Sequence, residues 1–354
     1  MKSLSVKLIA AILVFSLFLV LVSCDDVNDI VDDLNKEYED EEDNDKDSDK
    51  NKGDSKDTAS KDTDNSESGS DSAVTDNGNE ESEDDEPSIS AEDLEPTAEL
   101  TFSLSTDKQS YLVKGLSKNF KGDTIVVPAT YTGTDGRELP VVSVKGYAFK
   151  AKENIKKVYL PDSITSIASS AFAECVNLEE IHCGAGLQDI GISAFSGCEK
   201  LTTITFGNNL KNIKREAFFE CESLLKFNFK NGLEKIEARA FLGCRSLTSV
   251  VIPDSVKSIG EACFNLCSKI TTISLGSGLT SIDSFTFYFC NSLYEVRYNG
   301  SADDWANVYS DSTCYLSTEV KHVICETKDE NGNVINTEKV PIPKKGDNPD
   351  LPKK

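Results

Sequence analysis

Residues 187–206 read LQDIGISAFSGCEKLTTITF, and the same pattern returns every 23 positions along the chain. The clearest markers are six cysteines, each of which follows a phenylalanine by three residues. These cysteines are Cys175, Cys198, Cys221, Cys244, Cys267 and Cys290. A fixed period of this length is the signature of a stacked repeat, in which each unit buries its apolar face against its neighbours. The sequence therefore predicts a solenoid.

Alignment at a step of 23 places apolar residues in register from residue 141 to residue 298, without insertion or deletion. The piece Leu201–Phe206, LTTITF, is apolar at alternate positions. Alternate residues of a strand point to opposite faces, so Ile204 and Phe206 are expected to point inward and the threonines outward. The Ala-Phe-x-x-Cys piece is expected on the opposite side of the coil, as one short helical turn.

The full pattern, I-x-x-x-A-F-x-x-C-x-x-L-x-x-I, resembles the BspA-type (Treponema pallidum-type) leucine-rich repeat family. The resemblance implies an α/β solenoid, a right-handed leucine-rich repeat coil of about seven 23-residue repeats with a parallel sheet on one face. The open ends of such a coil expose core, so both need a cap. We expect an N-terminal β-rich cap at 96–140, the repeat solenoid at 141–298 and a C-terminal cap at 299–326.

The N-terminus has the features of an export signal. Two lysines precede an apolar run at 8–22, which is shorter than the roughly 20 residues of a membrane-spanning helix. The run ends in Leu-Val-Ser-Cys24, which resembles the lipobox of bacterial lipoproteins. The resemblance implies a signal peptide at 1–23, lipidation of Cys24 and display at the cell surface, on the outer membrane or the outer face of the cell envelope. An ordinary secretory signal or an uncleaved anchor is the alternative.

The acidity of the chain lies in one segment. Residues 25–95 hold 30 of the 61 Asp and Glu residues and 6 of the 37 Lys and Arg residues. With Tyr38 as its one aromatic residue, this stretch cannot bury enough apolar surface to offset its chain entropy. We therefore expect a disordered acidic tether at 24–95, and a disordered tail at the proline-containing residues 327–354. The remaining chain is nearly neutral and has no basic stripe, so nothing favours nucleic-acid binding.

The cysteine ladder is expected to pack rather than to form disulfides. Neighbouring coils stack in parallel about 4.8 Å apart, whereas a disulfide needs Cβ vectors that converge. Free cysteine also serves as a small buried apolar residue. Cys314 and Cys325 lie outside the repeats, and a disulfide between them is possible. The chain has two histidines and no C-x-x-C pair, so no metal site and no cofactor are expected.

No nucleophile motif, phosphate-binding loop or zinc-protease motif is present, so the chain is not expected to be an enzyme. Solenoids act through the surface that their repetition creates, which directs attention to the outward strand positions. Their Thr and Ser residues also suit any exposed strand. Tyrosine and arginine, by contrast, are enriched at interface hot spots. The candidate partner-binding residues are Tyr159, His182, Asn228, Val251, Tyr294 and Arg297.

The family resemblance implies a monomeric surface lipoprotein that binds proteins through its repeat face, in adhesion or cell-surface interaction. Its partner would be a host matrix protein or the surface of another cell, and its N-terminal lipid would hold it in a membrane. A surface protein that binds glycans or other small ligands is the alternative, and it would predict an aromatic-lined groove.

Overall fold

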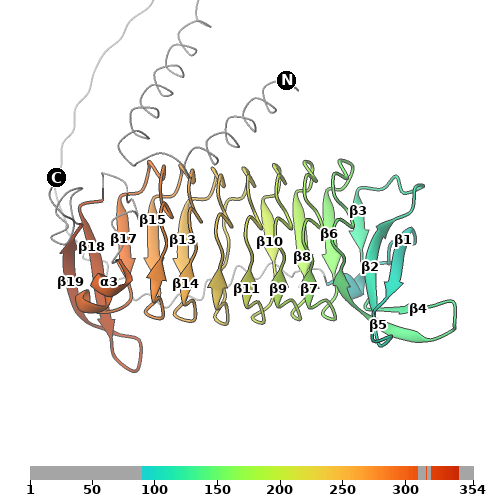
Figure 1. Ribbon diagram of the computed structural model, residues 1–354, viewed down its shortest axis with the longest axis horizontal. Helices are drawn as coiled ribbons and strands as arrows, with labels where there is room; N and C mark the ends of the chain where they lie inside the picture. The colour runs from blue at the N-terminus through green and yellow to red at the C-terminus, as the bar shows by residue number, and fades with distance from the viewer. Residues whose placement is uncertain (1–89, 310–315, 317–319, 343–354) are drawn as a thin grey trace, which may run out of the picture. The chain divides into compact units, whose positions relative to one another are not determined.

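The computed structural model describes residues 90–309, 316 and 320–342. These residues form an elongated solenoid with one cap at each end (Figure 1). Successive coils pair at a constant offset of 23, so that Val158 lies beside Ile181 and Ile181 beside Ile204. The predicted repeat length and solenoid class are confirmed.

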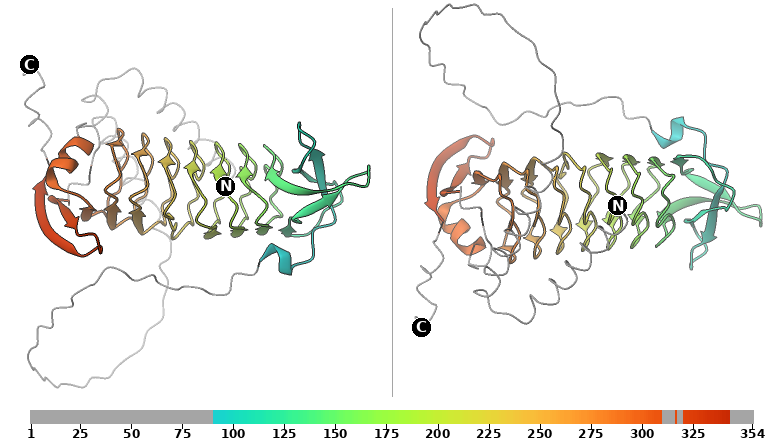
Figure 2. Two further views of the ribbon diagram at one scale, coloured as in Figure 1. Left: turned by 90° about the horizontal axis from the view of Figure 1, so that it is seen from below. Right: turned by 90° about the horizontal axis from the view of Figure 1, so that it is seen from above.

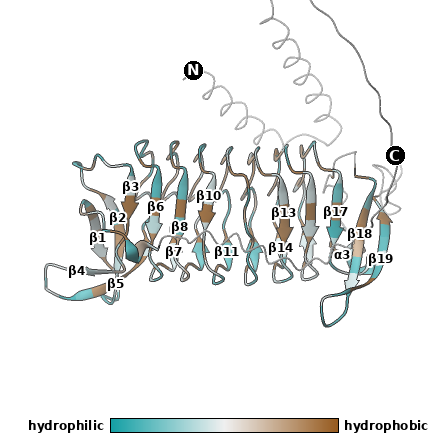
Figure 3. Cartoon of the chain, turned by 180° about the vertical axis from the view of Figure 1, so that it is seen from behind, coloured by the Kyte–Doolittle hydropathy of each residue, from teal (hydrophilic) through white to brown (hydrophobic). Residues whose placement is uncertain are grey.

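The predicted parallel strands form one side of the solenoid (Figure 3). In strands such as β8 and β15, buried apolar residues alternate with partly exposed polar residues. At the N-terminal end they join β3, Thr124–Val126, and at the C-terminal end they join the hairpin of β18 and β19. The repeat strands are β6 (Lys157–Leu160), β8 (Glu180–Cys183), β10 (Thr203–Thr205), β13 (Ser249–Ile252), β15 (Thr272–Leu275) and β17 (Glu295–Tyr298).

This sheet is interrupted between β10 and β13, where residues 226–229 belong to neither part. Phe227 lies there in an inward column that is otherwise aliphatic, Phe229 lies in the next inward column, and their rings are 4.6 Å apart. The backbone contact from Thr248 N to the Leu225 carbonyl is 3.4 Å long, against 2.9 Å for the equivalent contact one coil later. The break in regular strand pairing therefore coincides with the coil in which two large rings pack against each other.

A second parallel sheet, which the sequence pattern did not predict, follows the isoleucine column that precedes the Ala-Phe piece. Its repeat strands have two residues each and continue from the N-terminal cap (Figure 2). They are β7 (Ser166–Ile167), β9 (Asp189–Ile190), β11 (Asn212–Ile213), β12 (Lys235–Ile236), β14 (Ser258–Ile259) and β16 (Ser281–Ile282). The cap strands are β1 (Leu100–Leu104), β2 (Tyr111–Leu116), β4 (Thr130–Thr132) and β5 (Glu138–Val144).

The Ala-Phe-x-x-Cys piece is not the helical turn that we expected. Two positions per coil have left-handed backbone, such as Glu216 at φ 59° and Glu220 at φ 55°. This conformation turns amide groups toward the next coil, where Phe218 N donates to the Ala240 carbonyl at 2.7 Å and Glu220 N to the Leu242 carbonyl at 2.8 Å. The Ala-Phe-x-x-Cys piece of each coil therefore forms a third line of hydrogen bonds between coils, in addition to the two sheets.

The core holds a stack of phenylalanine rings along the solenoid axis. Phe218 is completely buried, and its ring centre lies 5.2 Å from that of Phe195 and 5.1 Å from that of Phe241. The stack comprises Phe149, Phe172, Phe195, Phe218, Phe241, Phe264 and Phe287. Its parallel rings fill the same space in every coil, which fixes the coil width.

Each ladder cysteine donates a hydrogen bond as well as filling space. Cys221 Sγ lies 3.2 Å from the carbonyl oxygen of Phe195, and the other five ladder thiols make the same contact 26 residues upstream. The Phe195 carbonyl already accepts one hydrogen bond, from the Cys198 amide at 3.1 Å. The Cys221 thiol is a weak donor to the second lone pair of this buried oxygen. The cysteines are all buried and free, as the packing interpretation requires.

Both ends of the described chain are more ordered than predicted. Residues 327–342 are not a loose tail, because they complete a hairpin of β18 (His322–Lys328) and β19 (Val334–Pro341) that extends the sheet beyond β17. Before it, α3 (Ala302–Val308) starts with a capping box and buries Trp305 against Tyr298. In the segment expected as a tether, η2 (Ala91–Asp93) packs against the cap. Within the described ranges no helix is long and apolar enough to cross a membrane.

Replacement of Phe218 by alanine should lower the free energy of unfolding by about 3–5 kcal/mol, because it leaves a cavity between two stacked rings. Urea denaturation followed by circular dichroism measures the loss. Phe219→Ala is the control, since this neighbouring ring is partly exposed and outside the stack. Equal losses in the two variants would contradict a central role for the stack.

The buried thiols should be unreactive in the folded protein. Burial raises the pKa of Cys175 to about 11 and that of Cys290 to about 12, and it holds the pKa of Cys198, Cys221 and Cys267 well above the usual value. Only the thiolate reacts with alkylating agents. N-ethylmaleimide at pH 8 followed by mass spectrometry should leave these residues unlabelled until guanidinium unfolds the chain. Rapid labelling of Cys221 in the native protein would refute this.

The same shifts determine the dependence of stability on alkaline pH. Thiols of the unfolded chain lose their protons near pH 9.0, whereas the buried thiols of the folded chain keep theirs. Their contribution to stability is therefore complete below that pH and decreases as the pH rises above it. Urea midpoints measured from pH 7 to pH 10.5 should fall in the upper part of this range, and less steeply for a Cys198→Ala, Cys221→Ala variant.

Candidate functional site

The outward side chains of β6, β8, β10, β13, β15 and β17, those of the residue directly before each of these strands, and those of Leu225, Lys226 and Asn228 form one continuous surface, which we call the strand face. All six predicted binding residues lie on it or beneath its cover. Its N-terminal half, residues 156–205, and its C-terminal half, residues 225–297, differ in chemistry.

The N-terminal end of the strand face is covered by residues that directly precede the cap. Ala91 and Leu94 pack on Val126 and Tyr159, which form a small cluster separate from the main core. Thr97 fastens this segment, since its amide donates to the Val126 carbonyl at 3.0 Å and its Oγ1 accepts from Val126 N at 2.9 Å. Tyr159 is consequently only 8% exposed, so its prediction as an accessible binding residue is wrong.

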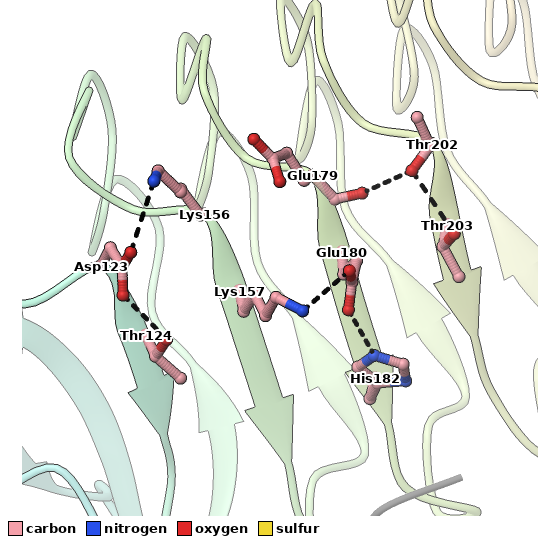
Figure 4. A network of polar contacts seen from close by, with 9 residues as sticks. All are labelled: Asp123, Thr124, Lys156, Lys157, Glu179, Glu180, His182, Thr202 and Thr203. Carbon is pink, nitrogen blue, oxygen red and sulfur yellow. Dashed lines mark hydrogen bonds and ion pairs between the residues drawn. The ribbon is translucent and has the colours of Figure 1, made fainter. Parts of the chain in front are cut away.

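Beside Tyr159 the polar side chains of the strand face pair with one another (Figure 4). Lys157 Nζ lies 2.9 Å from Glu180 Oε1, and Glu180 Oε2 lies 3.4 Å from His182 Nε2. The other ring nitrogen of His182 lies 3.2 Å from Thr205 Oγ1, and its ring stacks on Tyr159 at 4.9 Å. The hydrogen bond from Lys157 lowers the pKa of Glu180, although partial burial opposes this. His182 is thus one member of a structural network, and the carboxylate that it contacts, Glu180, is shared with Lys157.

The C-terminal half of the strand face exposes large apolar side chains. Val251 is 62% exposed, Tyr294 60% and Leu225 53%. Val251 and Tyr294 were predicted as binding residues, and Asn228 beside them is also exposed. Leu225 was missed, although a leucine in an outward column of otherwise mostly polar residues is a recognisable signal.

Arg297 is held in place at the end of this half. Its guanidinium contacts Glu295 Oε1 and Glu326 Oε1, both at 2.7 Å, and the hydrogen bond that it donates to Glu295 is the main cause of its raised pKa. Glu326 belongs to β18, so the C-terminal cap orients a side chain of the last repeat. The side chain of Arg297 nevertheless remains about half exposed, so a partner could contact it.

The other predicted sites lie partly outside the described residues. Cys24 and Cys314 are both outside them, so lipidation and the Cys314–Cys325 disulfide stay predictions. Cys325 itself is a buried free thiol in β18, beside Tyr298. Among the residues that the structure describes, no group of three or more His, Cys, Asp or Glu side chains could hold a metal ion.

These features define a capped leucine-rich repeat solenoid. A family model described as the BspA type leucine rich repeat region matches six copies, at residues 142–244 and 211–324. The chain belongs to this family, which confirms the resemblance inferred from the repeat pattern. No curated protein sequence matches the chain.

Solved structures of leucine-rich repeat proteins are similar to the solenoid. One, from Bacteroides ovatus, is 26% identical with a TM-score of 0.52 over 58% of this chain. The match spans 55% of that protein, so this chain corresponds to about half of its length. The leucine-rich repeat protein of T. pallidum is 28% identical, with a TM-score of 0.41 over 57% of this chain and 80% of that one.

Docking of the segment around Ala91 can be tested by Ala91→Asp. A carboxylate cannot be buried without a partner, so the segment should detach and expose Tyr159. Hydrogen exchange of the Val126 amide should then become at least tenfold faster. Glu92→Ala, at an exposed position, is the control and should exchange like the wild type. Unchanged exchange in Ala91→Asp would show that Ala91 does not hold the segment in place.

Proposed function

We propose that this chain is a binding protein that recognises another protein through the C-terminal half of its strand face. The single observation that supports this most is the exposure of Leu225, Val251 and Tyr294 on one surface of small polar residues. Large exposed apolar side chains surrounded by polar ones are typical of protein interaction sites. Leu225 and Tyr294 are three coils apart, or roughly 14 Å at about 4.8 Å per coil, which a single partner can span.

Tyr294 is the best anchor on this surface. Tyrosine and arginine are the residue types that most often dominate interface energies, and Arg297 lies beside Tyr294 in the same coil. Because Glu295 and Glu326 already fix the guanidinium, its immobilisation would cost little further entropy on binding. The polar network around His182 lacks such exposed apolar groups and would contribute at most a rim.

The finer proposal is a surface lipoprotein that acts in adhesion or cell-surface interaction and is not an enzyme. The apolar run at 8–22 and the lipobox-like end at Cys24 support export and anchoring. The acidic composition of 25–89 supports a solvated connection between the anchor and the repeat domain. The proposed partner is a host matrix protein or the surface of another cell.

The proposal can be tested on cells that produce the full chain. Binding of a panel of labelled extracellular matrix proteins, and of whole partner cells, would be compared between the wild type and a Tyr294→Ala, Val251→Lys double variant. Because the variant removes an anchor and places a charge in the interface, binding should fall at least tenfold. Surface amounts are matched by antibody staining, which protease treatment of intact cells should abolish.

A matched control separates the two halves of the strand face. Thr202→Ala and Lys156→Ala change exposed residues of the N-terminal half and should leave binding unchanged. Equal loss in both variants, or no loss in the Tyr294→Ala, Val251→Lys variant, would overturn the assignment to the C-terminal half. Resistance of the protein to external protease would overturn display at the surface.

A further inference from the structure

A pocket of about 300 Å³ lies at the ends of β6, β8 and β10, where the segment before the cap crosses the strand face. Segments far apart in the sequence form it, because one wall comes from residues 90–91 and the rest from three successive coils. The principal lining residues are Ser90, Ala91, Asp162, His182, Thr205 and Phe206.

Two glycines make this hollow possible. A Cβ atom at Gly184 would overlap the backbone nitrogen of Asp162, and one at Gly207 would lie 2.6 Å from the Cα of Ala185. The turns that follow β8 and β10 can therefore lie close against the preceding coil. Together with small Ala185, they leave room above Leu160 and Phe206, which contribute apolar surface to the lining.

The polar groups of the pocket are fixed in position by the fold. Ala185 N donates to Asp162 Oδ1 at 2.7 Å, and no described residue pairs with Asp162 Oδ2. His182 is held between Glu180 and Thr205 and is stacked on Tyr159, so its ring cannot turn freely. Ser90 Oγ accepts from the Glu92 amide at 3.2 Å, and Thr205 Oγ1 pairs with His182, so each hydroxyl keeps one further bond for a ligand. The pocket thus offers both donors and acceptors in a fixed arrangement.

Charge and size limit the ligands that this pocket could hold. The Asp162 carboxylate disfavours an anion, because no lysine or arginine is among the lining residues. The mixture of hydroxyl and carboxylate groups suits a ligand with several neutral hydroxyls, each of which can donate and accept. A volume of about 300 Å³ is at the lower limit of ligand pockets, enough for one six-membered sugar ring.

We propose that this pocket binds one neutral hexose unit, with Asp162 and Thr205 as its hydrogen-bonding residues and the fixed ring of His182 as part of its wall. Ser90 and Ala91 form this wall at the N-terminal end of the strand face, so among the described residues the repeat does not reproduce it in later coils. The inference is independent of the proposed protein partner, which would contact the other half of the strand face.

Saturation-transfer NMR on the full chain, purified in detergent, would test this with D-glucose, D-galactose and D-mannose at millimolar concentration. At least one hexose should bind, and Thr205→Val should weaken it roughly tenfold through the lost hydroxyl. Glucuronic acid should bind at least tenfold more weakly than the neutral sugar. Asp162→Asn, which keeps the oxygen that accepts from Ala185, should reduce this discrimination.

Two controls keep the test decisive. Ser274→Ala changes the same column three coils later, away from the pocket, and should bind the hexose like the wild type. Circular dichroism melting curves establish that each variant is folded, and Thr205→Val conserves shape at a strand position. No signal from any hexose, equal binding by Thr205→Val, or preference for glucuronic acid or glucosamine would overturn the proposal. Loss of hexose binding with intact matrix-protein binding would leave the proposed function standing.

Discussion

Hydrogen bonding between coils of equal length is the constraint on which this structure depends. Successive coils pair on three sides, through the strands of the strand face, the two-residue strands and the left-handed turns, with strand-face pairing interrupted at residues 226–229. One inserted residue would shift all three lines at once, because each requires the same offset of 23. The phenylalanine stack obeys the same rule, since its rings can lie parallel only where successive coils have the same width. The absence of insertions between residues 141 and 298 follows from this geometry.

Much of the core could be predicted from sequence because its columns are occupied by unmistakable residue types. Ile190, Phe195 and Cys198 are all completely buried, as their period requires. The second sheet could not be predicted in this way, since a two-residue strand shows no alternation. The turns were missed because glycine, the usual marker of left-handed backbone, stands at Gly197 and Gly243 but not at the other equivalent positions. The β18–β19 hairpin was missed because its mostly exposed, charged sequence resembles a tail.

The exposure of a candidate site residue could be predicted only where no distant segment of the chain covers the coil that carries it. Val251 lies in β13 and Tyr294 directly before β17, and both side chains are largely exposed, so their outward position sufficed. Tyr159 has the same outward position but is buried by Ala91, which is 68 positions earlier and lies at the end of a stretch with the composition of a tether. The interruption of the sheet needed two phenylalanines in one coil, and its effect becomes clear only when their rings are packed together. Contacts between distant segments, rather than the repeat itself, make the two halves of the strand face different.

The cysteine ladder also makes each coil a reporter of the closure of its neighbour. A thiol such as Cys244 finds its acceptor, the Phe218 carbonyl, in the preceding coil, so it is shielded only after both coils have closed and stacked. The moment at which each thiol disappears from solvent therefore records when one particular interface formed. From Cys175 to Cys290 there is one such thiol in each coil. The order in which these thiols become protected from solvent would therefore give the order in which the coils of the solenoid stack.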